Sequence, residues 1–300
     1  MADQRILTVP AGQQVARLLI SCPDRPGIIA AVTTFLKDHG ANITDLDQHS
    51  TLDGEGEALG VFFMRLEFQT VHAQEYLAAR FDKEVAQPCE MDWQLNYASR
   101  YKRMALLASR YDHALLEVLW RVSRGELALT VPFIISNHLD LKVHADYFNV
   151  PFYHFPVTPN NKQAIEQNIL ALCADKKVEG LILARYMQIL SPEFVAHYPN
   201  KIINIHHSFL PAFIGANPYQ QAYERGVKLI GATAHYVTNE LDMGPIIAQE
   251  VVNVSHRLDV TKLKELGQYA ERTALARAIK AHVEDRIIVD GNKTVVFNLH

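Results

Sequence analysis

Three side chains in the second half of the chain have the types and the spacing that attack on an acyl group requires. Asn204 and His206 alternate in the apolar run 202–206, so a strand here places both side chains on one face. Asp242 follows in the polar segment 241–245. If that segment folds back over the strand end, an amide, an imidazole and a carboxylate converge, and such a set can polarise an acyl group and move a proton. The pattern therefore indicates a candidate site for acyl transfer or hydrolysis.

Each of these three residues also fits a purely structural role. Asn204 can cap the strand, His206 can be a half-buried histidine with satisfied hydrogen bonds, and Asp242 can begin the turn before Gly244 and Pro245. The convergence depends on the path of the later loop, which the sequence does not give. Residue types alone therefore leave both interpretations open.

Neither a metal site nor a disulfide is expected. None of the 14 histidines falls in an H-E-x-x-H or similar spacing, and His206 and His207 would face opposite sides of a strand. The 3 cysteines, Cys22, Cys89 and Cys173, are far apart and form no C-x-x-C pair. We therefore expect reduced thiols and no bound metal.

Length and composition predict two domains and exclude several classes of partner. A chain of 300 residues with 49% hydrophobic residues can bury two cores. The formal net charge of −4, with both signs mixed along the chain, gives no electrostatic footprint for nucleic acid or an anionic membrane. The start has no signal-peptide regions, and no stretch approaches the roughly 20 apolar residues of a membrane span. We expect a cytoplasmic protein that acts on a small molecule.

Residues 1–98 are expected to form a ferredoxin-like domain. Strands are predicted near residues 15–22, 43–50, 59–68 and 93–96, with a turn at Asp53-Gly54 between the second and third. A first helix should begin after the turn 23–27 and end at Gly40, and a second should span residues 76–85. The order βαββαβ predicts an antiparallel sheet with helices on one face.

Residues 99–300 change to an alternation of strands and helices. Strands are predicted near residues 104–108, 131–135, 151–156, 180–184 and 201–206. A long helix, 260–283, is expected to serve packing, and a hairpin over residues 286–297 follows it. This α/β alternation predicts a doubly wound, mostly parallel sheet, in which ligands bind beyond the carboxyl ends of the strands. No G-x-G-x-x-G follows a strand, which argues against a dinucleotide-dependent oxidoreductase.

The segment NIHHSFLPAFIGANPYQQAYERGVKLIGATAHYVTNELDMGPII, residues 204–247, resembles the formyltetrahydrofolate-dependent formyltransferase and hydrolase family. The resemblance implies that Asn204, His206 and Asp242 form the catalytic triad and that His235 supports it. Asp242 would orient and deprotonate a water, directly or through His206. His206 would donate to the oxyanion and carry the proton, while the Asn204 amide would donate to the same oxygen.

The segment LARYMQIL, residues 183–190, resembles the strand and loop that hold the pterin ring in this family. The resemblance implies that Met187, Gln188, Ile189 and Leu190 contact folate. Ordinary core packing is the alternative for the three apolar residues. No cofactor is implied, because 10-formyltetrahydrofolate is the substrate.

Three activities share this architecture, and two features separate them. The transferase that acts on phosphoribosylglycinamide has a glycine-rich phosphate loop after its first strand, whereas residues 109–113 contain no glycine and include Asp112. The transferase that acts on initiator tRNA has a further C-terminal domain, and no basic patch replaces it here. The expected reaction is hydrolysis of 10-formyltetrahydrofolate to formate and tetrahydrofolate, which supplies formate for one-carbon and purine metabolism. Formyl transfer to an amine acceptor such as phosphoribosylglycinamide is the alternative, and a non-catalytic folate or amino-acid binding protein is disfavoured by the complete triad.

The N-terminal segment VARLLISCPDRPGIIAAVTTFLKDHGANITDLDQHS resembles an ACT domain, and an ACT domain fused to this catalytic domain resembles the formyltetrahydrofolate deformylase family over nearly the whole chain. The resemblance implies an amino-acid effector, glycine or methionine, near Asp24, Gly27 and Asn42, and a homo-oligomer. The alternative for residues 24–27 is a simple turn and helix start, with Pro26 near the first helical position.

Overall fold

The computed structural model describes residues 12–51, 60–211 and 218–297, which divide into two compact units. The first unit comprises Met1–Arg100, Glu284–Ile288 and Val295–His300, and the second comprises Tyr101–Val283 and Val289–Thr294. The turn predicted at Asp53-Gly54 lies outside the described residues. The functional boundary between residues 98 and 99 stays a prediction.

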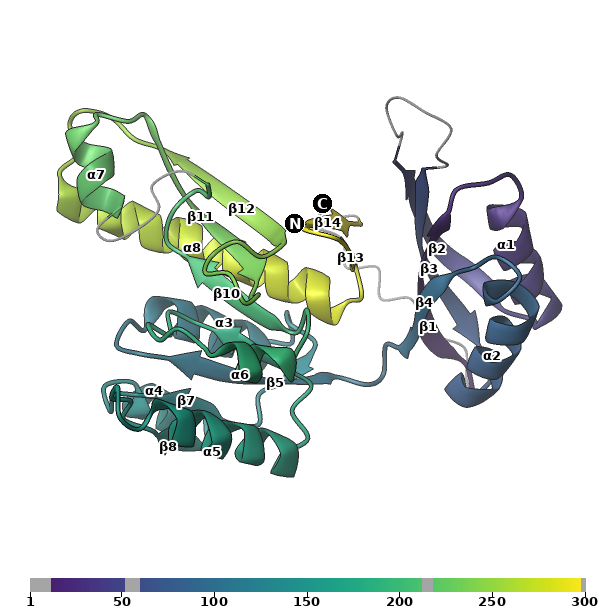
Figure 1. The fold of residues 1–300 in the computed structure, drawn as a ribbon, viewed down its shortest axis with the longest axis horizontal. Coiled ribbons are helices and arrows are strands. Elements are labelled where there is room, and N and C mark those ends of the chain that lie inside the picture. The colour runs from purple at the N-terminus through teal and green to yellow at the C-terminus, as the bar shows by residue number, and fades with distance from the viewer. Residues whose placement is uncertain (1–11, 52–59, 212–217, 298–300) are drawn as a thin grey trace. The chain divides into compact units, whose positions relative to one another are not determined.

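The first unit has the predicted βαββαβ order (Figure 1). Its elements are β1 (Gln14–Pro23), α1 (Ile28–Asp38), β2 (Asn42–Ser50), β3 (Val61–Thr70), α2 (Gln74–Phe81), the π-helical turn η1 (Asp82–Ala86) and β4 (Asp92–Tyr97). The four strands form an antiparallel sheet in the order β2-β3-β1-β4. The second helix of the predicted pattern is thus an α-helix that ends at Phe81 and continues as a π-helical turn.

The two faces of this sheet differ in chemistry because side chains alternate along each strand. Leu18, Ile20, Met64 and Leu66 lie on one face and form a core with residues of α1 and α2. Their neighbours in the chain point to the other face and include charged side chains.

Arg65 is the centre of the charged face. It is 1% exposed, and its guanidinium donates to Asp45 Oδ2 at 3.0 Å and to Glu67 Oε2 at 3.2 Å. It also donates to the backbone carbonyls of Asp285, at 2.9 Å, and Glu284, at 3.3 Å. The residues that follow the last helix therefore complete the first unit by satisfying a buried arginine.

The second unit contains the alternating elements that the sequence predicts (Figure 1). They are β5 (Lys102–Ala108), α3 (His113–Ser123), β6 (Leu129–Thr130), β7 (Ile134–Ser136), α4 (Lys142–Tyr147), β8 (Phe152–His154), α5 (Lys162–Asp175), β9 (Gly180–Leu183), α6 (Pro192–Ala196), β10 (Ile202–His206), α7 (Pro218–Glu224), β11 (Leu229–Tyr236), β12 (Ile246–Asn253) and α8 (Val260–Val283). A hairpin of β13 (Ile287–Asp290) and β14 (Lys293–Val296) follows.

The main sheet of this unit has the order β12-β11-β10-β9-β5-β7-β8. Neighbouring strands from β8 to β10 are parallel, and β11 and β12 add as antiparallel strands. One face carries a core formed with α5 and α6, to which no residue of α3 or α8 belongs. Instead, α8 packs against α3 and against β10, β11 and β12, so helices cover both faces. The α/β architecture with a mostly parallel central sheet is confirmed.

Arg65 gives a stability prediction for the first unit. Replacing Arg65 with Met leaves two backbone carbonyls and two carboxylates without their shared donor. We expect a loss of about 3 kcal/mol in the free energy of unfolding, because an ionic cluster that loses its central charge leaves the others uncompensated. Urea unfolding followed by Trp93 fluorescence, in a Trp120→Phe background, measures it.

Arg80→Met is the matched control, since Arg80 is exposed and its ion-pair partner among the described residues is Glu84 in the adjoining turn η1. Its cost should stay below about 1 kcal/mol. Equal losses in the two variants would contradict the structural role assigned to Arg65.

Candidate active site

The pairing of β10 with β11 fixes the positions of three polar side chains. Asn204 lies opposite His235 in this antiparallel pair, and Asn204 Nδ2 is 3.2 Å from His235 Nε2. His206 is the last residue of β10 and lies on the same strand face as Asn204. His206 is 8% exposed and His235 is 2% exposed, so both rings are shielded from bulk solvent.

The loop between β11 and β12 returns Asp242 to the end of β10. Asp242 Oδ2 lies 3.2 Å from His206 Nδ1, and its Oδ1 lies 3.7 Å from His235 Nε2. The backbone of Asp242 has φ 56°, a left-handed conformation that few residues other than glycine adopt. A Cβ on Gly244 would collide with the carbonyl oxygen of Tyr236, so glycine lets the loop pass this close to β11. The structure thus brings the three residues predicted as catalytic together with His235.

The histidine neighbours of Asp242 keep its carboxylate charged. The hydrogen bond from His206 is the largest of the effects that hold the pKa of Asp242 well below its usual range, against the opposite effect of partial burial. A carboxylate only accepts, so His206 Nδ1 carries the proton between the two groups. In a neutral His206 the lone pair is then on Nε2, which is buried and has no hydrogen-bond partner among the described residues. His206 Nε2 is therefore available to accept a proton.

His235 orients the amide of Asn204. His235 Nδ1 is 2.9 Å from the backbone carbonyl of Tyr236, which only accepts, so Nδ1 carries a proton. In the neutral ring Nε2 is an acceptor, and Asn204 Nδ2 donates one of its two hydrogens to it. This contact decides which end of the amide faces His235 and leaves the second hydrogen for a further acceptor.

The segment predicted to bind folate follows β9. Met187 and Ile189 are 54% and 61% exposed, although both are apolar, and Gln188 is half-buried. Leu190 instead packs against the core of the unit. This is the core-packing role that was the alternative to folate binding for the apolar residues of this segment. The N–H of Met187 donates to Ser109 Oγ at 3.0 Å and so connects the segment to the end of β5.

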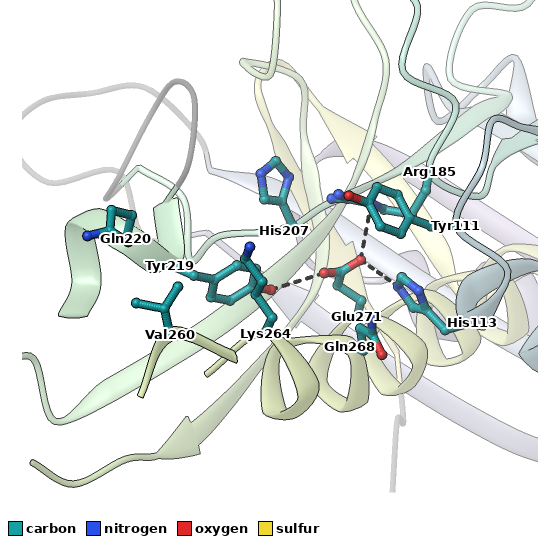
Figure 2. A pocket seen from close by; sticks show the side chains of 10 residues that line it. All are labelled: Tyr111, His113, Arg185, His207, Tyr219, Gln220, Val260, Lys264, Gln268 and Glu271. Atoms are coloured by element: carbon teal, nitrogen blue, oxygen red, sulfur yellow. Dashed lines mark hydrogen bonds and ion pairs between the residues drawn. The ribbon is translucent and has the colours of Figure 1, made fainter. Parts of the chain in front are cut away.

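A cavity of about 340 Å³ opens at the carboxyl ends of β5, β9 and β10 (Figure 2). Arg185 comes from the segment after β9, and His207 directly follows His206 of β10. The helices α3, α7 and α8 contribute further walls, with His113 from α3, Tyr219 from α7, and Lys264 and Glu271 from α8. This position at the strand ends is where α/β sheets bind ligands.

Glu271 of α8 is the central group of this cavity (Figure 2). It accepts hydrogen bonds from His113 Nε2 at 2.8 Å and from the Tyr219 hydroxyl at 3.0 Å, and Arg185 Nε lies 3.5 Å from it. Burial raises the pKa of Glu271, but the His113 hydrogen bond and the Arg185 charge outweigh it and leave the pKa below its usual range. A Cβ on Gly267 would collide with the Tyr219 hydroxyl, so this glycine admits the tyrosine to α8.

Sequence alone did not single out Glu271 or Arg185. Helix 260–283 was expected to serve packing, whereas α8 also places Glu271 in the cavity wall. The available signal was a carboxylate on the apolar helix face that includes Ala270 and Ala274. Arg185 belongs to the segment quoted for folate binding, but only the four residues from Met187 onward were assigned.

Comparison with known proteins assigns the chain to a family. A formyl transferase model matches residues 102–279, and an ACT domain model matches residues 16–75. The formyltetrahydrofolate deformylase of Bacillus subtilis is 50% identical over 285 residues, which cover 94% of this chain and 93% of that protein. This chain belongs to the formyltetrahydrofolate deformylase family.

Solved structures separate this family from other formyltransferase folds. The formyltetrahydrofolate deformylase of Pseudomonas syringae pv. tomato superposes with a TM-score of 0.90 and 44% identity, covering 95% of this chain and 95% of that one. Glycinamide ribonucleotide transformylase 1 of Symbiobacterium toebii gives a TM-score of 0.63 at 28% identity and covers 68% of this chain and 98% of its own. The similarity to the deformylase thus extends over both units, whereas the transformylase matches two thirds of the chain.

The effector residues predicted for the ACT domain do not form one site within a single chain. Asp24 follows β1, whose last residue, Pro23, pairs with Val61. Asn42 pairs with Gln69 at the other end of the same strand, eight residues along, which is about 26 Å of strand. Gly27 caps α1 with φ 94°, a left-handed conformation that favours glycine. An effector site at Asp24 and Gly27 therefore cannot include Asn42 of the same chain.

Thiols, metal ligands and membrane spans were also considered in the sequence, and the structure describes each of these features. The thiols of Cys22, Cys89 and Cys173 are free. Residues 12–51, 60–211 and 218–297 contain no cluster of three or more side chains suited to a metal ion. Over the same ranges, no helix is long and apolar enough to cross a membrane.

The low pKa of Asp242 predicts how stability depends on pH. A carboxyl whose pKa is depressed by folding stabilises the protein above its unfolded pKa of about 3.9, and this contribution is lost as pH falls through that value toward the lower folded pKa. The stability difference between the protein and Asp242→Asn should therefore be largest above about pH 5 and shrink toward pH 3.

Urea midpoints at pH 6 and pH 3, followed by Trp120 fluorescence in a Trp93→Phe background, measure this difference. Asp146→Asn is the control, because Asp146 is exposed and pairs with Lys142 on the surface. A difference for Asp242→Asn that does not change with pH would contradict the pairing described here.

Proposed function

We propose that this protein hydrolyses 10-formyltetrahydrofolate to formate and tetrahydrofolate, with Asn204, His206 and Asp242 as catalytic residues. The observation that carries the proposal is the contact between Asp242 and His206 Nδ1, which leaves His206 Nε2 buried, unpaired among the described residues and able to take a proton. The full-length similarity to proteins named formyltetrahydrofolate deformylase gives the substrate.

His206 is the group that takes the proton from the attacking water. The pKa of Asp242 is held so low that its carboxylate is a poor base at neutral pH. Asp242 instead fixes His206 with Nδ1 protonated and stabilises the imidazolium that forms when Nε2 accepts the water proton. This division of roles places the base in His206 and the orienting charge in Asp242.

The formyl oxygen becomes negative when water adds to the formyl carbon, and Asn204 donates to it. One Nδ2 hydrogen of Asn204 is held by His235, so the amide is oriented before the substrate binds. The second hydrogen then meets the oxyanion. The C–N bond breaks as the imidazolium of His206 returns its proton to the folate nitrogen, and the formyl group leaves as formic acid, which releases a proton to water and becomes formate. No covalent intermediate with the protein is formed.

Exposed apolar side chains next to the triad suit the pterin ring. Met187 and Ile189 are exposed in the segment after β9, and Leu241 and Met243, which flank Asp242, are 63% and 52% exposed. Burying such side chains against an aromatic ring is favourable. Gln188 is half-buried in the same segment, where its amide can hydrogen-bond a ring edge.

Transfer to an amine acceptor is less well supported than hydrolysis. Residues 109–113 follow β5 without a glycine, and Ser109 is already engaged, because its hydroxyl donates to Asn137 and accepts from the N–H of Met187. Asp112 stands at the start of α3 and adds a negative charge where a phosphate would bind. A phosphorylated amine would therefore meet an unfavourable site.

The N-terminal unit supplies regulation in this proposal. Residues 1–98 would form a regulatory ACT domain for the catalytic residues 99–300 and bind glycine or methionine at Asp24 and Gly27. We propose a homo-oligomer in the cytoplasm, in which a second copy completes the effector site that Asn42 of the same chain does not reach. The reaction needs no cofactor and would supply formate to one-carbon and purine metabolism.

Asp242→Asn tests the reaction and the triad together. With 10-formyltetrahydrofolate and no amine, the full-length protein should release formate, and the variant should lose at least about 10³-fold in kcat, because the neutral amide no longer stabilises the His206 imidazolium. Formate and tetrahydrofolate are measured directly, and folate affinity should change little.

His256→Asn is the matched control, since His256 is exposed and belongs neither to the triad nor to the cavity lining. Near-normal turnover by Asp242→Asn would refute the triad. Product formation only after phosphoribosylglycinamide is added would identify a transferase instead.

Asn204→Ala tests the oxyanion contact separately. Losing one preorganised donor should lower kcat by about 10²–10³-fold, with a much smaller change in KM, because the contact forms fully only in the transition state. Steady-state kinetics of formate release measure both constants. A variant that raises KM at unchanged kcat would assign Asn204 to substrate binding alone.

A further inference from the structure

The cavity beside the triad contains an arginine whose donors are unused. The side chain of Arg185 is 10% exposed, and its guanidinium donates no hydrogen bond to any described residue. Its polar contact is the 3.5 Å ion pair with Glu271, and the ring of Tyr111 lies 5.2 Å from its charged carbon. Figure 2 shows Arg185 beside Tyr111, with Glu271 next to it. A guanidinium buried to this extent needs further acceptors, which a ligand can provide.

The fixed charges of the cavity leave one positive charge uncompensated. Arg185 and Lys264 are cationic, and Lys264 has no ion-pair partner in the described part of the chain, whereas Glu271 contributes one negative charge. Burial and then the Arg185 charge lower the pKa of His207 to about 4, so His207 is neutral at neutral pH. Among the arginine, lysine and carboxylate side chains of the lining, a ligand with a single negative charge balances this set.

Glu271 does not compete for that ligand, because its own hydrogen bonds are already formed. His113 and Tyr219 donate to its two oxygens, and Arg185 lies near one of them. Glu271 thus holds Arg185 in place. The charged groups left to recognise a ligand, Arg185 and Lys264, are donors, and the planar fork of a guanidinium matches the two oxygens of a carboxylate.

We propose that this cavity is a binding site for a small monocarboxylate, held by Arg185 and Lys264. Resting on the function proposed above, the ligand is the product formate on its way out. His207 lines the cavity, and its ring centroid is 5.1 Å from that of His206. Formate that forms at His206 can therefore enter the cavity by moving past the His207 ring.

The size of the cavity fits this role. A volume of about 340 Å³ holds formate together with several water molecules, each of which occupies about 30 Å³ in the liquid. The same space therefore supplies the water that the reaction consumes and receives the carboxylate that it makes.

Binding is tested on the full-length protein without folate, so that it does not depend on turnover. 13C-formate is titrated at constant ionic strength and followed by its NMR relaxation, with formamide as a neutral control. We expect saturable binding of formate that acetate weakens by competition, and none of formamide. Lys264→Gln should weaken formate binding about two- to fivefold, and Arg185→Gln about tenfold or more.

Lys262→Gln is the matched control, because Lys262 is on the same helix, pairs with Glu265 and does not line the cavity. It should leave formate binding unchanged, and Lys264 is exposed enough that its replacement spares the fold. Absence of saturable binding, or equal affinity in the Lys264 and Lys262 variants, overturns the proposal. Displacement of formate by inorganic phosphate more strongly than by acetate overturns the monocarboxylate assignment.

The outcomes also separate this site from the reaction. Saturable formate binding that Lys264→Gln weakens, in a protein that releases no formate from 10-formyltetrahydrofolate, supports the carboxylate site and refutes the proposed function. Formate release without saturable formate binding supports the function and refutes the site.

Discussion

The contact between Asp242 and His206 is the interaction on which the proposed active site depends. Its two partners come from segments 36 residues apart, and the contact forms only because β11 pairs with β10 and the following loop turns back over the strand end. Asp242 adopts a left-handed backbone conformation, and Gly244 allows a close approach to Tyr236. Local backbone strain is thus accepted at the residue whose charge sets the proton position on His206.

Two adjacent histidines divide the site into two environments. His206 is hydrogen-bonded to the Asp242 carboxylate, whereas His207 lines the cavity that contains Arg185 and Glu271. β10 ends at His206, so His207 lies just beyond the regular strand, and the ring centroids of the two histidines are 5.1 Å apart. Each environment has its own carboxylate, and the two differ in function: Asp242 faces a proton acceptor, and Glu271 holds a cation. The expectation that these two side chains face opposite sides of a strand is wrong, because the strand ends at His206.

Much of the fold was predictable from the sequence, because apolar residues recur with the period of a helix or a strand in the segments that form these elements. The run around β1 and the repeat in α1 indicated the ferredoxin-like unit, and the long helix was predicted with the bounds of α8. Asn204 and His206 were found through their strand spacing. The contacts of Asp242, and the cavity with Glu271, were not predictable from spacing, because they depend on how a loop and a helix distant in the chain pack against the strand ends. Met187 is exposed and Leu190 packs against the core, and the sequence did not predict this difference. Residue type alone does not distinguish an exposed apolar side chain from one in the core.

The acceptors of Arg65 have a consequence for how this protein can evolve. The chain leaves the second unit at Val283, and the next residues, Glu284 and Asp285, supply backbone carbonyls to an arginine of the first unit. The first unit is therefore not built from one continuous segment of the chain, and a single recombination event cannot transfer it whole to another enzyme. A single crossover near residue 100 would separate the arginine from its acceptors, so exchange of this module requires two crossovers, at both ends of the catalytic unit.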